Sequence, residues 1–244
     1  MRIRARNISK RAAAGSSVLT IASMNPHVSL VTEDTPDIGD ISAWMSRTNN
    51  IEFISNFPGR ELTPYPNYLG THGKMIGTSE KLTKFLRFPD KSAFKYTHNG
   101  SAFTIVMACQ GKHGSSYSDG ALSTMYNTSG TNGFLLSHAF RLTYRNNGQS
   151  AQLNPYNSHH GVQTVSFGVT AAQVLFMEIE GVRYETDISH FTFTDDDHDY
   201  GMAVGRTEGN SFYKVGDTHI FDRELTAVEL TAAIMELKTK HNTP

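Results

Sequence analysis

Residues 204–229 read VGRTEGNSFYKVGDTHIFDRELTAVE, and this stretch predicts the end of a β-sheet protein followed by a helix. Gly216 and Asp217 are turn formers that lead into a strand around Ile220. Thr226 and Glu229 then form a capping box, in which the hydroxyl and the carboxylate each accept a hydrogen bond from a backbone N–H that lacks a helical partner. The stretch therefore predicts a last strand and, directly after it, a helix that closes the chain.

The closing helix has one apolar face and a basic end. Leu230, Ile234 and Leu237 follow one another at helical spacing, so they lie on the face that packs against the rest of the protein. Lys238, Lys240 and His241 sit at the negative end of the helix dipole, where positive charge is stabilising. No other segment carries comparable helix signals.

Upstream, short apolar or alternating runs recur every 8–12 residues or so, with clusters of Gly, Asn and Ser between them. Residues 102–109, AFTIVMAC, are almost continuously apolar and predict a buried strand. Asn49–Asn50 and Glu180–Gly181 are typical of hairpin turns. Residues 56–80 hold three prolines and four glycines, and predict a long loop that is functional or covers a sheet edge. The remaining strands are predicted at 18–22, 27–32, 41–46, 51–55, 85–88, 121–126, 133–136, 140–144, 164–167, 174–179, 182–186 and 202–205.

The composition favours a β-rich protein and excludes several function classes. Of the 244 residues only 18% are charged, too few for a typical helical bundle, while 10% are aromatic. No apolar run approaches the roughly 20 residues of a membrane-spanning helix, so no membrane insertion is expected. The single cysteine, Cys109, excludes an internal disulfide and a multi-cysteine zinc site. A net charge of −1 gives no attraction to nucleic acid, and none is expected as a partner.

Several of these pieces, in this order, resemble concanavalin A-like, laminin G-like domains of the kind found in phage structural proteins. The resemblance covers about residues 85–241 and implies an all-β fold: an antiparallel β-sandwich (jelly roll, concanavalin A-like) with one short C-terminal helix. The matching motifs are 85–90 FLRFPD, 103–106 FTIV, 177–182 MEIEGV, 204–206 VGR, 216–217 GD and 221–226 FDRELT. In this family the pattern is architectural, and it does not determine function.

The N-terminal region differs in character from the rest of the chain. We expect two parts: residues 1–40, an extended basic arm and connector, and residues 41–244, the sandwich. A secretory signal does not fit, because residues 12–17, AAAGSS, are only weakly apolar. An Arg- and Ser-rich mitochondrial presequence and an arm packed on its own domain are alternatives. We favour an assembly arm that docks on a neighbouring subunit through its basic side chains, Arg2, Arg4, Arg6, Lys10 and Arg11.

The sequence offers no convincing catalytic residues. Glycoside hydrolases need two carboxylates flanking the scissile bond, and sandwich hydrolases carry them on a Glu-x-Asp-x-x-Glu strand, which is absent. Glu178 and Glu180 share a strand face but border a tight turn, where solvent keeps a general acid from gaining a raised pKa. We therefore expect that the chain is not an enzyme.

One acidic run is a candidate metal site. Asp195, Asp197 and Asp199 alternate within residues 195–199, and calcium takes several carboxylate oxygens. The run does not fit an EF-hand loop, and the alternative is a solvated loop between strands. Calcium is thus the one cofactor that the sequence makes a candidate.

Three tyrosines in polar loops are candidates for holding a sugar. Tyr117, Tyr126 and Tyr156 are surrounded by Asn, Ser, Thr and Gly, and an aromatic ring can stack on a pyranose while such neighbours supply hydrogen bonds. The alternative is that each ring packs locally.

Together these observations predict a virion structural protein, a phage capsid decoration or tail accessory subunit. Its partners would be other virion proteins or copies of itself in a homo-oligomer, and host cell-surface glycans. The alternative is a free-standing carbohydrate-binding, lectin-like module, and a glycoside hydrolase or lyase ranks third.

Overall fold

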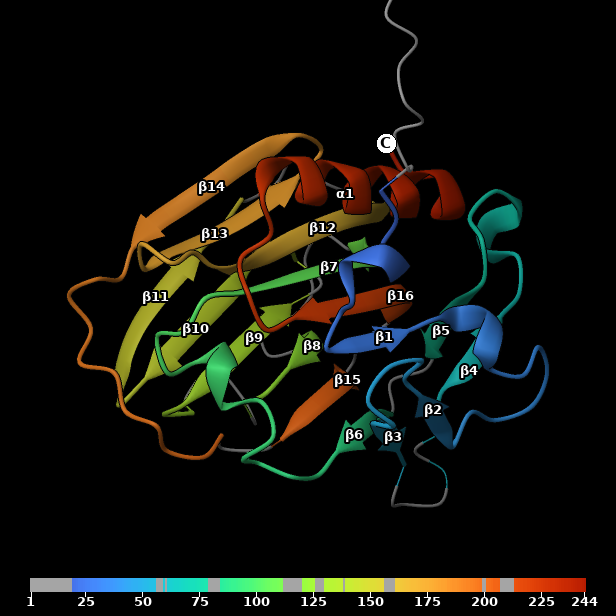
Figure 1. Ribbon diagram of the computed structural model, residues 1–244. Coiled ribbons are helices and arrows are strands. Elements are labelled where there is room, and N and C mark those ends of the chain that lie inside the picture. Colours follow the sequence, from blue (N-terminus) through green and yellow to red (C-terminus); the bar gives the residue numbers. More distant parts are fainter. Residues whose placement is uncertain are drawn as a thin grey trace, which may run out of the picture.

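The computed structural model describes residues 19–55, 59, 61–78, 84–111, 120–125, 130–137, 139–155, 161–198, 201–206 and 213–244. Within these ranges two antiparallel sheets of eight strands each pack face to face, and one α-helix, α1 (Ala227–His241), lies across the outer face of one sheet (Figure 1). This confirms the predicted all-β sandwich with a C-terminal helix. No helix in these ranges is long and apolar enough to cross a membrane.

The sheet beneath α1, here the helix-side sheet, has β16 near its centre. Along one edge β16 pairs with β7, and its other edge is shared by β5 and β1. In spatial order the strands are β14 (Val182–Asp187), β13 (Val174–Ile179), β12 (Gly161–Val169), β7 (Phe103–Gly111), β16 (Tyr213–Phe221), β5 (Met75–Thr78) and β4 (Thr63–Tyr65), with β1 (Val28–Leu30) beside β16.

The opposite sheet forms the second layer. Its strands run in the order β11 (Gln149–Leu153), β10 (Leu142–Asn146), β9 (Gly133–Ser137), β8 (Gly120–Ser123), β15 (Met202–Arg206), β6 (Leu86–Phe88), β3 (Glu52–Ile54) and β2 (Ala43–Met45). Short 3₁₀ turns join some of the strands: η1 (Ala22–Met24), η2 (Thr32–Asp34), η3 (Tyr68–Gly70) and η4 (Lys95–Thr97).

Two apolar cores hold these layers together. The larger core lies between the sheets, where alternate residues of each strand bury rings such as Trp44, Phe53 and Phe134. The Trp44 indole N–H donates to the carbonyl of Val31 at 3.0 Å, so this buried polar group is satisfied. The smaller core lies under α1 and contains Ile21, Met24, Val106, Phe176, Phe221, Leu225, Leu230, Ala233 and Leu237. The helix therefore stabilises the outer face of the helix-side sheet, which would otherwise expose apolar residues.

The predicted capping box is present and is extended by an ion pair. The Thr226 hydroxyl accepts from the backbone N–H of Glu229, and the Glu229 carboxylate accepts from the backbone N–H of Thr226 at 2.9 Å. Arg223 donates to both oxygens of Glu229, at 2.7 and 3.0 Å, and to the carbonyl of Met24 at 3.3 Å. The hydrogen bond from Arg223 is the main cause that lowers the pKa of Glu229 to about 2. The first turn of α1 is thereby fastened to the N-terminal segment.

Most of the strand predictions hold, with informative exceptions. Asn49–Asn50 and Glu180–Gly181 do form tight hairpins, since all four residues have positive φ. The strand predicted at 18–22 is wrong, because this segment turns into η1 and packs under α1. The region 56–80 is more ordered than a loop, because its described part contributes β4 and β5 to the sheet.

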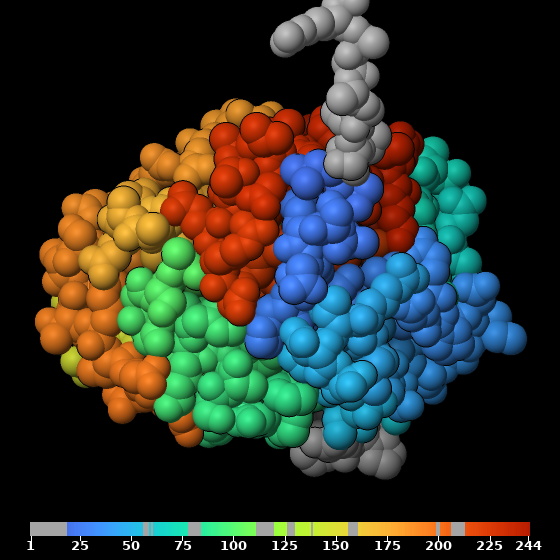
Figure 2. Space-filling view, viewed as in Figure 1, coloured from blue at the N-terminus to red at the C-terminus, as the bar shows by residue number. Residues whose placement is uncertain are grey.

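The described part of the predicted arm and connector joins the sandwich. β1, within residues 27–32 as predicted, pairs with β16, and Figure 2 shows the N-terminal segment lying against the C-terminal helix. The arm residues Arg2, Arg4, Arg6, Lys10 and Arg11 lie outside the described residues.

The capping box can be tested with Thr226→Ala. Loss of the hydroxyl leaves the N–H of Glu229 without an acceptor, so we expect the free energy of unfolding to fall by about 1 kcal/mol in urea denaturation. Thr231→Ala is the matched control, because the Thr231 hydroxyl donates to the helical carbonyl of Ala227 and caps nothing. An equal loss in both variants would contradict the capping role.

Candidate functional site

The site begins with an irregularity in β16. Val215 pairs with Cys109 and Thr218 with Met107, so β16 has one residue more than β7 between these pairs. Gly216 and Asp217 therefore form a β-bulge inside one continuous strand, and the prediction that they turn the chain into a strand is wrong. On the other edge the bulge falls between the residues that pair with β5 and those that pair with β1. The backbone of Asp217 is thus free to bond outside the sheet.

Glycine at position 216 allows the last turn of α1 to approach the bulge. A Cβ there would lie 2.8 Å from Cε1 of His241 and 2.9 Å from Cβ of Ala108. Real side chains do not come this close, so any other residue would push the end of the helix away. The close approach lets the backbone N–H of Asp217 donate to Nε2 of His241 at 3.2 Å.

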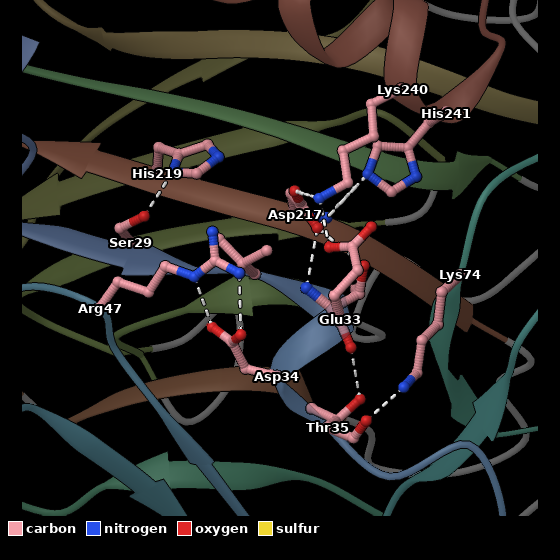
Figure 3. Close-up of polar contacts among 12 residues, drawn as sticks. Ser29, Glu33, Asp34, Thr35, Arg47, Lys74, Asp217, His219, Lys240 and His241 are labelled. Carbon is pink, nitrogen blue, oxygen red and sulfur yellow. Dashed lines mark hydrogen bonds and ion pairs between the residues drawn. The ribbon is translucent and has the colours of Figure 1, made fainter. Parts of the chain in front are cut away.

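The buried side chain of Asp217 joins three parts of the chain (Figure 3). Its Oδ1 accepts from both the backbone N–H and the hydroxyl of Thr32, each at 2.8 Å, and its Oδ2 accepts from the ammonium group of Lys240. Lys240 also donates to Glu33. Burial alone would raise the pKa of Asp217, but the neighbouring His241 and the charge of Lys240 outweigh it and hold the pKa well below its ordinary value. Asp217 is therefore ionised and ties η2, β16 and α1 together.

Next to Asp217, a serine and a histidine face each other across the β1–β16 pair. Ser29 and His219 are direct cross-strand partners, and the Ser29 hydroxyl shares a hydrogen bond of 3.1 Å with Nδ1 of His219. Burial lowers the pKa of His219 to about 4, so the imidazole is neutral at pH 7. A neutral imidazole has one donor and one acceptor nitrogen, so it can bond to either kind of polar group.

A pocket of about 250 Å³ opens beside these residues. It lies between the segment 21–26, β1, β16 and the C-terminal half of α1, and its polar walls come from Ser29, Arg47, Asp217, His219, Glu236 and Lys240. Arg47 is held in place by two hydrogen bonds to Asp34, at 2.7 and 2.8 Å. Glu236 accepts from the backbone N–H of Ile21 at 2.7 Å. Polar groups in fixed positions thus line this pocket together with the apolar side chains of Ile21, Val31 and Leu237.

This pocket was not predicted from the sequence. Ser29, Arg47 and Lys240 are far apart along the chain and meet only because β1 pairs with β16 beneath α1. A signal was present in β16, where Asp217 and His219 are polar residues two positions apart in a strand that is buried along its whole length.

Two of the predicted calcium residues, Asp195 and Asp197, lie beside the ammonium group of Lys95. Nζ of Lys95 lies 3.1 Å from Oδ1 of Asp197 and 4.0 Å from Oδ2 of Asp195, and Asn99 donates to Asp195 at 2.8 Å. Asp199 lies outside the described residues, among which no group of three or more His, Cys, Asp or Glu side chains is placed to hold a metal. Calcium binding at this run stays a prediction.

The predicted sugar-binding tyrosines, Tyr117, Tyr126 and Tyr156, also lie outside the described residues. The strands that flank two of them are neighbours: β7 ends at Gly111 before Tyr117, β12 begins at Gly161 after Tyr156, and these glycines pair with each other. Tyr117 precedes the first residue of β8 in the sequence, whereas Tyr126 comes after the last residue of β8. Their role in sugar binding stays a prediction.

Solved structures with a similar fold include a sialidase and the binding domain of a neurotoxin. A Trypanosoma rangeli sialidase in complex with sialic acid matches with a TM-score of 0.57 and 11% identity, over 92% of this chain and 34% of the sialidase. The binding domain of botulinum neurotoxin DC in complex with SialylT matches with a TM-score of 0.53 and 10% identity, over 87% of this chain and 52% of the toxin chain. This chain thus spans about a third and about half of these proteins. At such identities the likeness shows the fold alone.

No protein-family model matches the sequence, and no curated protein sequence matches it.

The expectation that the chain is not an enzyme is contradicted by these neighbours. Structures that share the fold include several sialidases from Trypanosoma rangeli, one of them a covalent intermediate with 2,3-difluorosialic acid. The expectation rested on the absence of one hydrolase motif, and a single motif does not represent all the chemistry that occurs in proteins containing this sandwich.

Removing the charge of Asp217 should destabilise the fold. Asp217→Asn leaves Lys240 with less compensating charge in a buried site, so we expect the free energy of unfolding to drop by about 3 kcal/mol in urea denaturation. Asp222→Asn is the matched control, since Asp222 is 57% exposed and lies 3.7 Å from His27. We expect it to cost less than about 1 kcal/mol. A near-neutral Asp217→Asn variant would refute the anchoring role.

The buried His219 predicts a loss of stability in mild acid. Its pKa in the folded protein is about 4, below the ordinary 6.5, so the unfolded chain binds more protons between these pH values. The stabilising contribution of neutral His219 is complete well above pH 6.5. It is lost as the pH falls, and the loss amounts to about 2 kcal/mol at pH 5. Urea denaturation of the wild type and His219→Gln at pH 7 and pH 5 should show a smaller pH effect in the variant. An equal pH effect in the wild type and in His219→Gln would contradict the prediction. His190→Gln serves as the control, because His190 is exposed.

Proposed function

We propose that this chain is a glycan-binding domain and that the pocket beside His219 holds one sugar unit. Sialidase and neurotoxin structures with the same fold, bound to sialic acid and SialylT, support this proposal. The observation that carries it is the chemistry of the pocket. A sugar hydroxyl both donates and accepts, and the pocket combines the cations Arg47 and Lys240, the carboxylates Asp217 and Glu236, and a neutral imidazole.

The size of the pocket agrees with a single sugar. Sites for drug-sized ligands measure roughly 300–1,000 Å³, and this pocket has about 250 Å³. Arg47 and Lys240 already have carboxylate partners in Asp34, Glu33 and Asp217, so neither presents an uncompensated positive charge to the ligand. Recognition would then depend on directed hydrogen bonds.

We further propose that the domain belongs to a virion, as a capsid decoration or tail accessory subunit that touches host glycans. Two sequence features support this: the resemblance to laminin G-like domains of phage structural proteins, and the five basic residues among positions 1–11, which suit an arm that fastens the domain to its neighbours. Oligomerisation and virion partners follow from this proposal.

A glycan array tests the proposed binding. We expect the wild type to retain a defined set of glycans and Arg47→Gln to bind them at least tenfold more weakly, because a hydrogen-bond donor at the pocket wall is replaced. Arg183→Gln is the matched control, since Arg183 pairs with Glu185 on β14, away from the pocket.

Two results would contradict the proposal: no retained glycan, or equal binding by the Arg47→Gln and Arg183→Gln variants. Incubation of the retained glycans with the wild type, followed by analysis for released sugar, then determines whether binding is accompanied by hydrolysis.

A further inference from the structure

The helix α1 has a second apolar face that the described residues leave uncovered. Its first apolar face, with Leu230, Ala233 and Leu237, packs on the sheet. On the outer side Val228 is 73% exposed and Met235 55% exposed, and half-buried Ala232 lies between them at helical spacing. A surface helix of a monomeric domain normally has one apolar stripe, so the second stripe indicates an interaction surface.

A groove lies beside the C-terminal part of this stripe, from Ala232 onward. It has a volume of about 560 Å³ and lies between α1 and the start of the described chain, with Leu19 and Thr20 on one wall and Ala232, Met235 and Thr239 on the other. Glu236 contributes a carboxylate to its lining. The groove adjoins the pocket beside His219 and shares Glu236 and Lys240 with it, while Met235 lines the groove alone.

The chain itself contains a segment that fits this groove. Residues 1–18 join the described part at Leu19, which is part of the groove wall. Extended, 18 residues reach up to about 60 Å. The isoleucines of this segment, at positions 3 and 8, can enter an apolar groove, and its five basic residues can pair with Glu236 on the side of the groove away from Lys240 only if the segment is placed accordingly.

We propose that this groove binds residues 1–18 of a second copy of the chain. Leu19 and Thr20 form one wall of the groove, and the choice of a second copy follows from the proposed role of the arm in assembly. A two-fold axis beside the groove places the start of each arm next to the groove of the other copy, so both arms bind in the same way. This inference rests on the proposed assembly role of the arm and adds the surface that receives it.

Cross-linking between differently labelled chains tests the exchange. One full-length chain carries Arg6→Cys and the other carries Met235→Cys, and the native Cys109 is buried and does not compete. We expect oxidation of the mixture to give a disulfide-linked pair containing one chain of each kind. Val182→Cys replaces Met235→Cys as the control, because Val182 is 48% exposed and lies on β14 at the edge of the helix-side sheet.

Light scattering of full-length variants gives an independent measurement. The wild type should be an oligomer, Met235→Glu should be monomeric because a carboxylate enters the apolar stripe, and Val182→Glu should remain an oligomer. Three results would overturn the proposal: a link that forms only within a chain carrying both cysteines, equal linking at position 182, or an oligomer that survives Met235→Glu. Glycan binding by Met235→Glu separates the two proposals, because the pocket beside His219 does not include Met235.

Discussion

The buried carboxylate of Asp217 is the point on which the outer side of the sandwich depends. Thr32 and Lys240 donate to its two oxygens, and His241 accepts from its backbone N–H. The 3₁₀ turn η2 and the end of α1 are therefore held against the central strand β16. The bulge makes this arrangement possible, because it frees the backbone of Asp217 from the sheet. A regular strand at this position would bond only to its neighbours, and the helix end would lose its hydrogen bonds to Asp217.

The same constraint shapes the surfaces to which we assign functions. Fixing α1 on the sheet leaves the pocket beside His219 between segment 21–26, β1, β16 and α1, with His219 and Arg47 already positioned by Ser29 and Asp34. Groups that are held before the ligand arrives lose less entropy on binding. On its other side α1 turns an apolar stripe outward. One helix therefore contributes to two surfaces, and a substitution on its outer side can affect assembly without reaching the pocket.

The elements that could be predicted from the sequence are those set by local chemistry. The capping box at Thr226 and the hairpin at Asn49–Asn50 depend on residues a few positions apart, and both appear as expected. The bulge at Gly216–Asp217 carries the same turn-forming residues as a true turn, and only its pairing with β7 distinguishes the two. The pocket could not be predicted, because pairing of β1 with β16 brings together side chains almost two hundred positions apart.

The central position of β16 has a consequence for how the chain is made. Ser29 emerges early from the ribosome, but its partner His219 comes 190 residues later, so β1, β5 and β7 wait with open edges for most of synthesis. Contacts this distant make folding slow and leave strand edges free to pair with other chains. A nascent chain interrupted before Lys240 also lacks the cation that neutralises Asp217. Incomplete products should therefore stay unfolded and open to proteolysis.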